Sequence, residues 1–531
     1  MASEIRSSHF LAVALVAFTL LFGSYLRFDR NDQKLLWYDE IVTALWYSGH
    51  DLRESMPALA NREIGVGELR KLLQIDPGSD LRDTLAGIVK DDPQHTPLYY
   101  LALRGWAELM GDSIGSLRSF SAVADLLILP VVFWLCLELF GSATVGWIAV
   151  VLVAISPFHI VYSQEARPYT LWMLAIVLAS AILLWTLRAP KAWKWCLYAL
   201  AVALGLYTHL LFCMVILSHA VYVFGLAFLR QFREKSPGLR EMVSFAAATT
   251  CALILFSPWI WVLATHSATA IRRVSWSGQE VGILHLLGMW AYNYSALFLD
   301  TNHALKYIGE PGITVYGAFL LRALTLIPAF FAVLHLLREP ARKTSLFLLP
   351  LIILPFLGLA LPDLIFGGMR SGGGNRYLAA SFLGLQIAIA YWLATGLFGA
   401  VAWQRNAMRG TLAFMLAMGV LSGIIFHRAD TWWHKSIGHF NVDVAQFINR
   451  TQRPLLIGRS ATGLISISHS LDEKVRILYI PGDDLPAIPA HYSDVFVLAP
   501  SKKLRDRLQS NQGLMLDEVV PRGKLYKVVT E

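Results

Sequence analysis

Charged residues are scarce in this chain. Asp, Glu, Lys and Arg make up 15% of its 531 residues, and hydrophobic residues make up 56%. Soluble globular domains carry about a quarter charged residues, so the low charge argues against a soluble protein and favours a membrane as the surrounding solvent. The 17 Trp and 19 Tyr agree with this interpretation, because their amphipathic rings collect at bilayer interfaces.

Cysteine spacing of the CxxC type is also lacking. Four cysteines lie in or at the edge of apolar runs, so they are interpreted as small buried hydrophobes rather than as disulfide or zinc partners; they are Cys136, Cys196, Cys213 and Cys251. The net charge is +8, but no basic stripe is present and most Lys and Arg fill short gaps between apolar runs. No nucleic-acid partner is therefore expected.

Long apolar runs indicate a polytopic membrane protein. The first run, Phe10 to Phe22, is followed by no A-x-A-like cleavage site, so it is predicted to be an uncleaved transmembrane helix. A helix needs about 20 apolar residues to cross the hydrocarbon core. Eleven spans are predicted, at roughly 9–27, 117–140, 143–162, 168–187, 193–208, 210–230, 242–264, 312–337, 345–361, 377–398 and 410–427.

The positions of Lys and Arg predict the orientation, since short basic loops stay in the cytoplasm. The short gaps on the other side of the membrane hold only Arg167, Arg370 and Arg376. The N-terminus is therefore predicted to be cytoplasmic, in a multi-pass protein of a cell inner membrane. One alternating set of gaps holds Arg188, Lys191, Lys194, Arg230, Arg233, Lys235, Arg240, Arg338, Arg342, Lys343, Arg405 and Arg409.

Three regions are then predicted outside the cytoplasm. Residues 1–427 form the transmembrane domain, and its external loop 28–116 carries an interfacial helix from Pro97 to Met110. A second external loop, about 266–311, carries another from Ile283 to Leu299. Residues 428–531 alternate strand-like and helix-like segments, which predicts a small extracytoplasmic α/β domain with a partly parallel sheet. Its predicted strands are Pro454 to Ile457, Val475 to Ile480, Asp494 to Leu498 and Lys524 to Val529, and its predicted helix is Ser501 to Gln509.

Two adjacent carboxylates, Asp39 and Glu40, follow the first span. Asp39 could simply cap the helix that continues through Ile41 to Tyr47. Near a low-dielectric surface a carboxylate is also a good general base, because partial desolvation raises its pKa. His95, at the end of the same loop, is either a phosphate ligand or an ordinary loop histidine.

Three further external positions carry candidates. Glu165 and Arg167 lie in a short turn, where they either pair with each other or leave Arg167 to grasp a phosphate through its fixed bidentate donors. His209 is either packed at the interface or functional. Arg376, after Gly372-Gly373-Gly374, either snorkels to the headgroups or supplies a second cation for a lipid phosphate. Each signal is weak alone, but all lie on the same predicted face.

These residues together resemble the GT-C membrane glycosyltransferases of family 39. That group includes protein O-mannosyltransferases, aminoarabinose transferases of lipid A and the bacterial RgtA/B/C/D-like proteins. The resemblance covers about residues 9–400. It rests on Tyr38-Asp39-Glu40, His95-Thr96-Pro97-Leu98-Tyr99-Tyr100, Gly111-Asp112-Ser113 to Phe140-Gly141, Gln164-Glu165-Ala166-Arg167-Pro168-Tyr169, Tyr207-Thr208-His209 and Arg376-Tyr377. Many relatives have two prolines before the leucine, where this chain has Thr96-Pro97.

The resemblance implies a function and roles. Such proteins transfer a sugar from a polyprenyl-phosphate carrier to an acceptor outside the cytoplasm, a lipid, glycan or protein, with inversion at the anomeric carbon. Asp39 would be the general base and Glu40 would orient it or the acceptor. Arg167 and Arg376 would offset the charge that grows on the leaving lipid phosphate. The candidates for binding substrate or lipid phosphate are His95, Glu165, Arg167, Tyr169, His209, Arg376 and Tyr377.

Two other functions remain open from the residues alone. A transporter or lipid flippase would need polar groups at mid-membrane in both halves, and no inverted halves with matching broken helices stand out. A non-catalytic subunit of an envelope polysaccharide assembly would use the tail domain to bind a partner. No cofactor is required by the sequence. Asp39, Glu40 and His95 could share a divalent cation, although no Asp-x-Asp motif is present.

Overall fold

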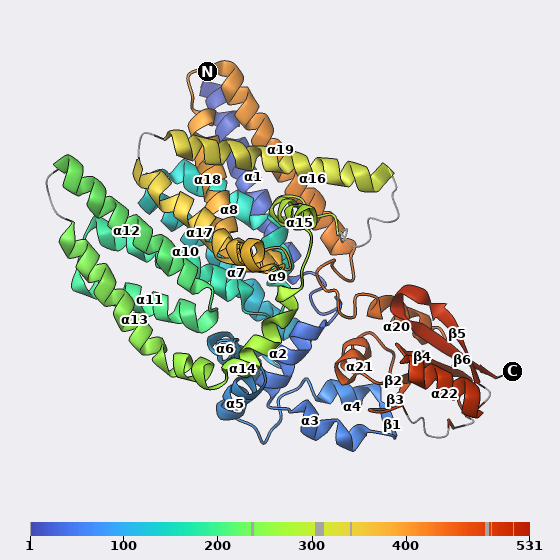
Figure 1. Cartoon of the computed structure of the whole chain (residues 1–531). Coiled ribbons are helices and arrows are strands. Elements are labelled where there is room, and N and C mark those ends of the chain that lie inside the picture. The colour runs from blue at the N-terminus through green and yellow to red at the C-terminus, as the bar shows by residue number, and fades with distance from the viewer. Residues whose placement is uncertain are drawn as a thin grey trace. The chain divides into compact units, whose positions relative to one another are not determined.

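The computed structural model describes residues 2–234, 238–302, 313–339, 342–483, 488–489, 491–512 and 514–530 (Figure 1). The chain forms two compact units. The first, here called the helical unit, comprises Met1–Asp29, Ile88–Tyr99 and Arg118–His427; the second, here called the sheet unit, comprises Arg30–Gly87, Tyr100–Leu117 and Arg428–Glu531. Lys235 and residues 303–311 of the predicted second external loop lie outside the described residues.

Long apolar helices make up most of the chain (Figure 1). The prediction of a polytopic α-helical membrane protein is confirmed. The helices are α1 (Ala2–Phe28), α7 (Ile114–Phe140), α8 (Ala143–Ala154), α9 (Pro157–Ser163), α10 (Tyr169–Arg188), α11 (Ala192–Thr208), α12 (Phe212–Glu234), α13 (Leu239–Thr265), α14 (Ser267–Val274), α15 (Ile283–Ser295), α16 (Ile313–Arg338), α17 (Arg342–Phe366), α18 (Ala379–Leu397) and α19 (Ala402–Arg428), with 3-10 turns η2 (Ser275–Gly278) and η4 (Asn375–Leu378).

The predicted count of eleven spans is not confirmed. In the described part of the chain, eight helices are long and apolar enough to cross a membrane, or nine if the bent pair α8 and α9 forms one span. The described apolar stretch of α1, Ala12–Phe28, and the 17-residue α11 are shorter. The predicted interfacial segments are helical, as α6 (Leu98–Met110) and α15.

Helix α18 lies at the centre of the helical unit. It packs against α8, α10, α16 and α17, and its side chains from Ala379 to Ala390 are buried. A helix that is apolar on every side is expected in such a position. The arrangement matters for function because η4, which carries Arg376, leads directly into α18.

A 56° bend separates α8 from α9. Pro157 is the first residue of α9 and has no N–H to continue the α8 ladder, which accounts for the break. The Ser156 hydroxyl at the bend donates to the carbonyl oxygen of Leu297 over 2.8 Å. Helix α9 then ends at Ser163, immediately before the turn that holds Glu165 and Arg167.

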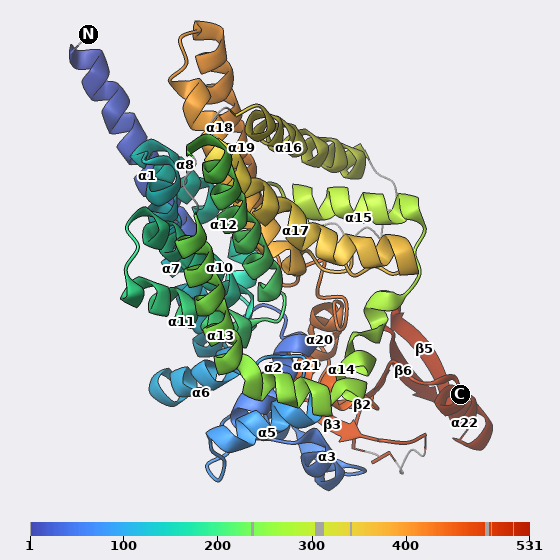
Figure 2. The same cartoon turned by 60° about the vertical axis from the view of Figure 1, so that its left-hand side comes forward.

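The sheet unit contains a six-stranded sheet in the order β1-β3-β2-β4-β6-β5. Strand β2 pairs in parallel with β3 and β4, and the other pairs are antiparallel; β5 and β6 run side by side in Figure 2. The prediction of a partly parallel sheet is confirmed. The strands are β1 (Glu63–Gly65), β2 (Pro454–Gly458), β3 (Arg476–Tyr479), β4 (Asp494–Leu498), β5 (Leu514–Val520) and β6 (Leu525–Thr530).

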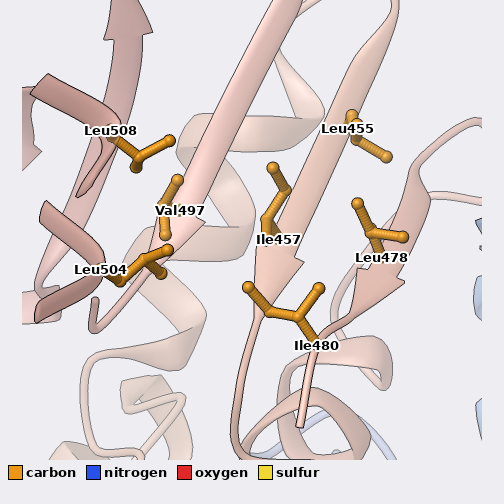
Figure 3. Packing of buried hydrophobic residues seen from close by; sticks show 7 residues of the cluster. All are labelled: Leu455, Ile457, Leu478, Ile480, Val497, Leu504 and Leu508. Atoms are coloured by element: carbon orange, nitrogen blue, oxygen red, sulfur yellow. The ribbon is translucent and has the colours of Figure 1, made fainter. Parts of the chain in front are cut away.

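Alternate side chains of the central strands face opposite layers of helix, as the period of two requires. Val497 of β4 faces Leu504 and Leu508 of α22 (Figure 3). The neighbouring Phe496 packs on Phe447 of α20, with 5.9 Å between ring centres. The helices outside the long apolar set are α2 (Tyr38–Ser48), α3 (Leu52–Ser55), η1 (Pro57–Leu59), α4 (Val66–Lys71), α5 (Leu81–Asp91), α6, α20 (Asn441–Asn449), α21 (Ala461–Ser468), α22 (Lys502–Gln512) and η5 (Pro521–Gly523).

One edge of this sheet comes from the first long loop. Residues Glu63–Gly65 pair antiparallel with Leu478, Ile477 and Arg476 of β3. This strand and β5 were not predicted. Three residues are too few to show a pattern, and the β5 sequence Leu-Met-Leu-Asp-Glu-Val-Val places two charges in mid-strand.

Candidate active site

The turn between α9 and α10 holds two of the predicted residues. Glu165 is fully buried and Arg167 is 3% exposed. The Arg167 amide donates to the carbonyl oxygen of Glu165 over 2.8 Å, and Pro168 caps α10. The Gln164 side-chain amide donates to the carbonyl oxygens of Leu26 and Asp29 over 2.6 and 2.7 Å, which ties the turn to the end of α1.

Arg376 comes from the start of η4 and is 8% exposed. Its neighbour Asn375 accepts a hydrogen bond of 2.6 Å from the Tyr162 hydroxyl of α9, so η4 is fixed to the helix that precedes the Glu165 turn. The interpretation of Arg376 as a residue that snorkels to headgroups does not fit this burial.

The glycine run before Arg376 allows a close approach of the backbone. A Cβ on Gly373 would lie 2.9 Å from the carbonyl oxygen of Met369 and 2.9 Å from the Trp276 ring. The Asp363 carboxylate accepts from the Arg370 and Ser371 amides over 2.9 and 2.7 Å, which orders the same loop. Arg376 is therefore presented by a tightly packed loop.

Tyr169, the first residue of α10, is the point at which the two arginines meet. The guanidinium carbon of Arg167 lies 5.8 Å from the centre of the Tyr169 ring, and that of Arg376 lies 5.6 Å from it. Arg376 is also 5.0 Å from the Tyr377 ring. Aromatic faces attract cations at these distances. Two buried guanidinium groups thus gather around one ring.

His209 packs among the same aromatic residues. Its ring stacks on Trp172 at 4.2 Å, and its centre lies 6.2 Å from that of Tyr377 and 6.5 Å from that of Tyr169. The Leu211 amide donates to Nδ1 over 3.2 Å, so the neutral ring carries its proton on Nε2. Desolvation by burial, followed by the charges of Arg167 and Arg376, lowers the pKa of His209 to about 3.

The charges of Arg167 and Arg376 also act on His95. Desolvation by burial, then the charges of Arg167, His209, Arg376 and Arg273, hold its pKa well below the ordinary value. Both histidines are therefore neutral near pH 7. The helical unit thus brings together Arg167, Tyr169, His209, Arg376 and Tyr377, with His95 in their field and Glu165 in the same turn.

Asp39 and Glu40 belong to the sheet unit, in the first turn of α2. The prediction of a helix there is confirmed, but Asp39 is not its cap, because α2 begins one residue earlier and Trp37 occupies the N-cap position. Asp39 is half-buried. Glu40 is 1% exposed, and its carboxylate lies 3.6 Å from the ammonium of Lys435, which is also buried.

Several buried polar and charged residues were not identified as candidates from the sequence. Lys435 gives no signal, because a single lysine after an apolar span is ordinary. Arg27, Asp125, His159 and Gln386 form a fully buried cluster between α1, α7, α9 and α18. Ionisable residues inside predicted spans could have indicated that cluster. No group of three His, Cys, Asp or Glu side chains suited to a metal ion occurs among the residues that the structure describes.

Known proteins resemble this chain in sequence over one part and in fold over nearly all of it. Residues 94–262 match the family described as dolichyl-phosphate-mannose-protein mannosyltransferase. A comparison with curated proteins gives no match. The crystal structure of ArnT from Cupriavidus metallidurans bound to undecaprenyl phosphate is similar with a TM-score of 0.52 and 14% identity, over 97% of both chains.

The apo form of the same ArnT matches with a TM-score of 0.50 and 14% identity, over 99% of this chain and 98% of that one. The chain thus shares the GT-C fold of ArnT over nearly its whole length, and the resemblance found in the sequence is confirmed at the level of the fold. The similarity to the mannosyltransferase family falls on the segment that contains His95, Glu165, Arg167, Tyr169 and His209.

Proposed function

We propose that this protein transfers a sugar from a polyprenyl-phosphate carrier to an acceptor outside the cytoplasm, with inversion at the anomeric carbon. The acceptor is a lipid, a polysaccharide or a protein. The protein lies in a cell inner membrane with its N-terminus in the cytoplasm and residues 428–531 outside. The fold shared with ArnT and the family match of residues 94–262 support the glycosyltransferase class.

The gathering of Arg167 and Arg376 around Tyr169 is the observation that carries the proposal. Two guanidinium groups held in a buried, aromatic setting suit a phosphate, whose oxygens accept their paired donors. The neutral state of His95 and His209 leaves both imidazoles able to donate a hydrogen bond without adding repulsion between cations. Tyr169 and Tyr377 position the arginines.

The chemistry follows from these roles. The acceptor hydroxyl oxygen attacks the anomeric carbon, and its proton passes to the Asp39 carboxylate. The bond between that carbon and the phosphate oxygen breaks on the opposite face, and the electron pair leaves with the lipid phosphate. Arg167 and Arg376 stabilise the negative charge that grows there, the contribution that is usually largest. Glu40 helps to orient Asp39.

The test uses the purified full chain in proteoliposomes with polyprenyl-phosphate sugars and a panel of lipid, glycan and peptide acceptors. Asp39→Asn should abolish transfer while expression, membrane insertion and the unfolding temperature stay unchanged. Asp76→Asn serves as a matched control, because Asp76 is a carboxylate of the same first loop whose side chain bonds only locally, to the Gly78 amide at 3.1 Å. Near-wild-type transfer by Asp39→Asn would refute the general-base role. Lipid translocation without any sugar transfer would instead support a flippase.

A further inference from the structure

Within the sheet unit, the residues just before α2 are held by the tail. The Leu35 amide donates to the carbonyl oxygen of Asp430 over 2.8 Å. The Ser466 hydroxyl, from α21, donates to the carbonyl oxygen of Leu36 over 2.6 Å. Helix α21 also packs directly on α2. The backbone that leads into Asp39 is therefore fixed by residues that lie hundreds of positions later in the chain.

Lys435 extends this contact to the carboxylates. Its ammonium lies 3.6 Å from the Glu40 carboxylate and donates to the carbonyl oxygen of Leu35 over 3.3 Å. The side chain of Glu40 is fully buried, and that of Lys435 is 4% exposed. Removal of one member of such a pair leaves an uncompensated buried charge, which is strongly unfavourable. Lys435 thus bonds to the backbone before α2 and balances the charge on its first turn.

The charged and titratable groups at this end of α2 are few. Asp39 and Glu40 come from α2 itself, and His434 and Lys435 come from the segment after α19. The His434 ring meets Trp37 edge-on at 5.6 Å. Helix α21 carries no titratable side chain, and His469, just beyond it, donates through Nε2 to the carbonyl oxygen of Asp32 over 2.7 Å. From the segment after α19, Lys435 is a cation that faces Glu40.

We infer that Lys435 is a positioning residue for the Asp39 base. Its ammonium faces the Glu40 carboxylate, and it fixes the turn that aims Asp39. The inference rests on the proposed function. It also assigns a role to the tail, which supplies a part of the catalytic arrangement without itself contacting the donor.

The test measures sugar transfer by the full-length protein in proteoliposomes from about pH 3.5 to about pH 8.5, a range that includes the ordinary titration of an aspartate. Lys435→Met should lower kcat and move the acid limb of its pH profile to higher pH by about one unit, because Glu40 would then repel the charge on Asp39. The KM for the lipid-phosphate donor should stay within about twofold, since no donor contact is lost. Lys435→Arg keeps the charge and should restore the wild-type profile.

A double variant guards against simple misfolding. Glu40→Gln alone removes the carboxylate that Lys435 faces, whereas Glu40→Gln with Lys435→Met removes both charges of the pair. The double variant should therefore have more folded protein than either single variant, and its acid limb should return towards wild type. A double variant no better than the singles would overturn the inference.

Arg70→Met is the matched control. Arg70 also links the first loop to the tail, because its guanidinium donates to the carbonyl oxygens of Ser468 and Leu471 and pairs with Glu473 at 2.6 Å. Its loss should lower stability without moving the pH profile. The inference would be wrong if Lys435→Met reduced transfer equally at every pH, as Arg70→Met would. Absence of transfer by the wild-type protein would instead refute the proposed function.

Discussion

The helical unit contains two buried clusters of charge that differ in what surrounds their arginines. In the first, the Arg27 guanidinium lies 2.7 Å from the Asp125 carboxylate, whose other oxygen is 2.9 Å from Nδ1 of His159. All three side chains are fully buried. Arg27 also donates to the carbonyl oxygens of Gly23 and Ala154 over 2.8 and 2.7 Å. One guanidinium is matched by one carboxylate.

The second cluster, around Tyr169, has two guanidinium groups, those of Arg167 and Arg376, and one buried carboxylate in the same turn, that of Glu165. Burial, followed by the charges of both arginines, lowers the pKa values of His95 and His209. In the first cluster a guanidinium pairs with a carboxylate, whereas in the second two guanidinium groups lie against the ring of Tyr169, a setting that suits a phosphate. This difference in setting is the reason to expect a structural role for the first cluster and a binding role for the second.

The largest effect is expected when one member of the pair formed by Arg27 and Asp125 is removed. Asp125→Ala leaves Arg27 buried and uncompensated, so folding should weaken by about 3–5 kcal/mol, and the unfolding temperature in detergent should fall steeply. Arg27→Met combined with Asp125→Leu removes both charges and should recover most of the loss. If Asp125→Ala unfolded at the wild-type temperature but failed to transfer sugar, the cluster would be functional instead of structural.

The opposite result is expected for the arginines around Tyr169. Arg376→Ala should reduce kcat about 10²–10³-fold, the usual effect of losing a group that stabilises transition-state charge, while the protein stays folded. Transfer assays and unfolding temperatures measured on the same sample check both parts. Arg370→Ala is the control, because Arg370 lies in the preceding loop and pairs with Asp363 at 3.0 Å. Equal losses from both arginines would show that the loop matters rather than Arg376.

A smaller change keeps the charge and alters its shape. Arg167→Lys retains the cation but loses the planar pair of donors, so the KM for the lipid-phosphate donor should rise about tenfold, the worth of one charge-assisted hydrogen bond. Arg167→Ala should cost more than Arg167→Lys. Identical kinetics for the two variants would mean that Arg167 does not meet the phosphate.

The smallest expected effect is on acid stability. The pKa of His209 is about 3 in the folded protein and 6.5 in the unfolded chain. Below pH 6.5 His209 binds a proton in the unfolded chain but not in the folded protein. The stability that is present above pH 6.5 is therefore lost progressively as the pH falls towards 3. His209→Asn should flatten the decline in unfolding temperature from pH 6.5 to 4. An unchanged slope would show that the pKa of His209 is not lowered in the folded protein.

The sequence was sufficient for the membrane fold and for strands β2, β3, β4 and β6 of the tail, and it named the residues around Tyr169 as candidates. The turn at 164–169 and the segment just before α18 carry arginines close to apolar spans. Charged residues at such places can be recognised from the sequence alone. The contact between Lys435 and Glu40 was not predictable, because no residue pattern tells which segment will cover the start of α2. The same holds for β1, whose partner strand lies in the tail.

That edge strand has a consequence for how the protein is made. Gly65 leaves the ribosome long before its partner Arg476. At about 5–20 residues per second, the delay is roughly 20–80 s. During this time the sheet does not yet exist, and the segment Glu63–Gly65 has no partner strand and is open to non-native pairing. A chaperone that shields Glu63–Gly65 should therefore speed maturation without influencing the finished protein.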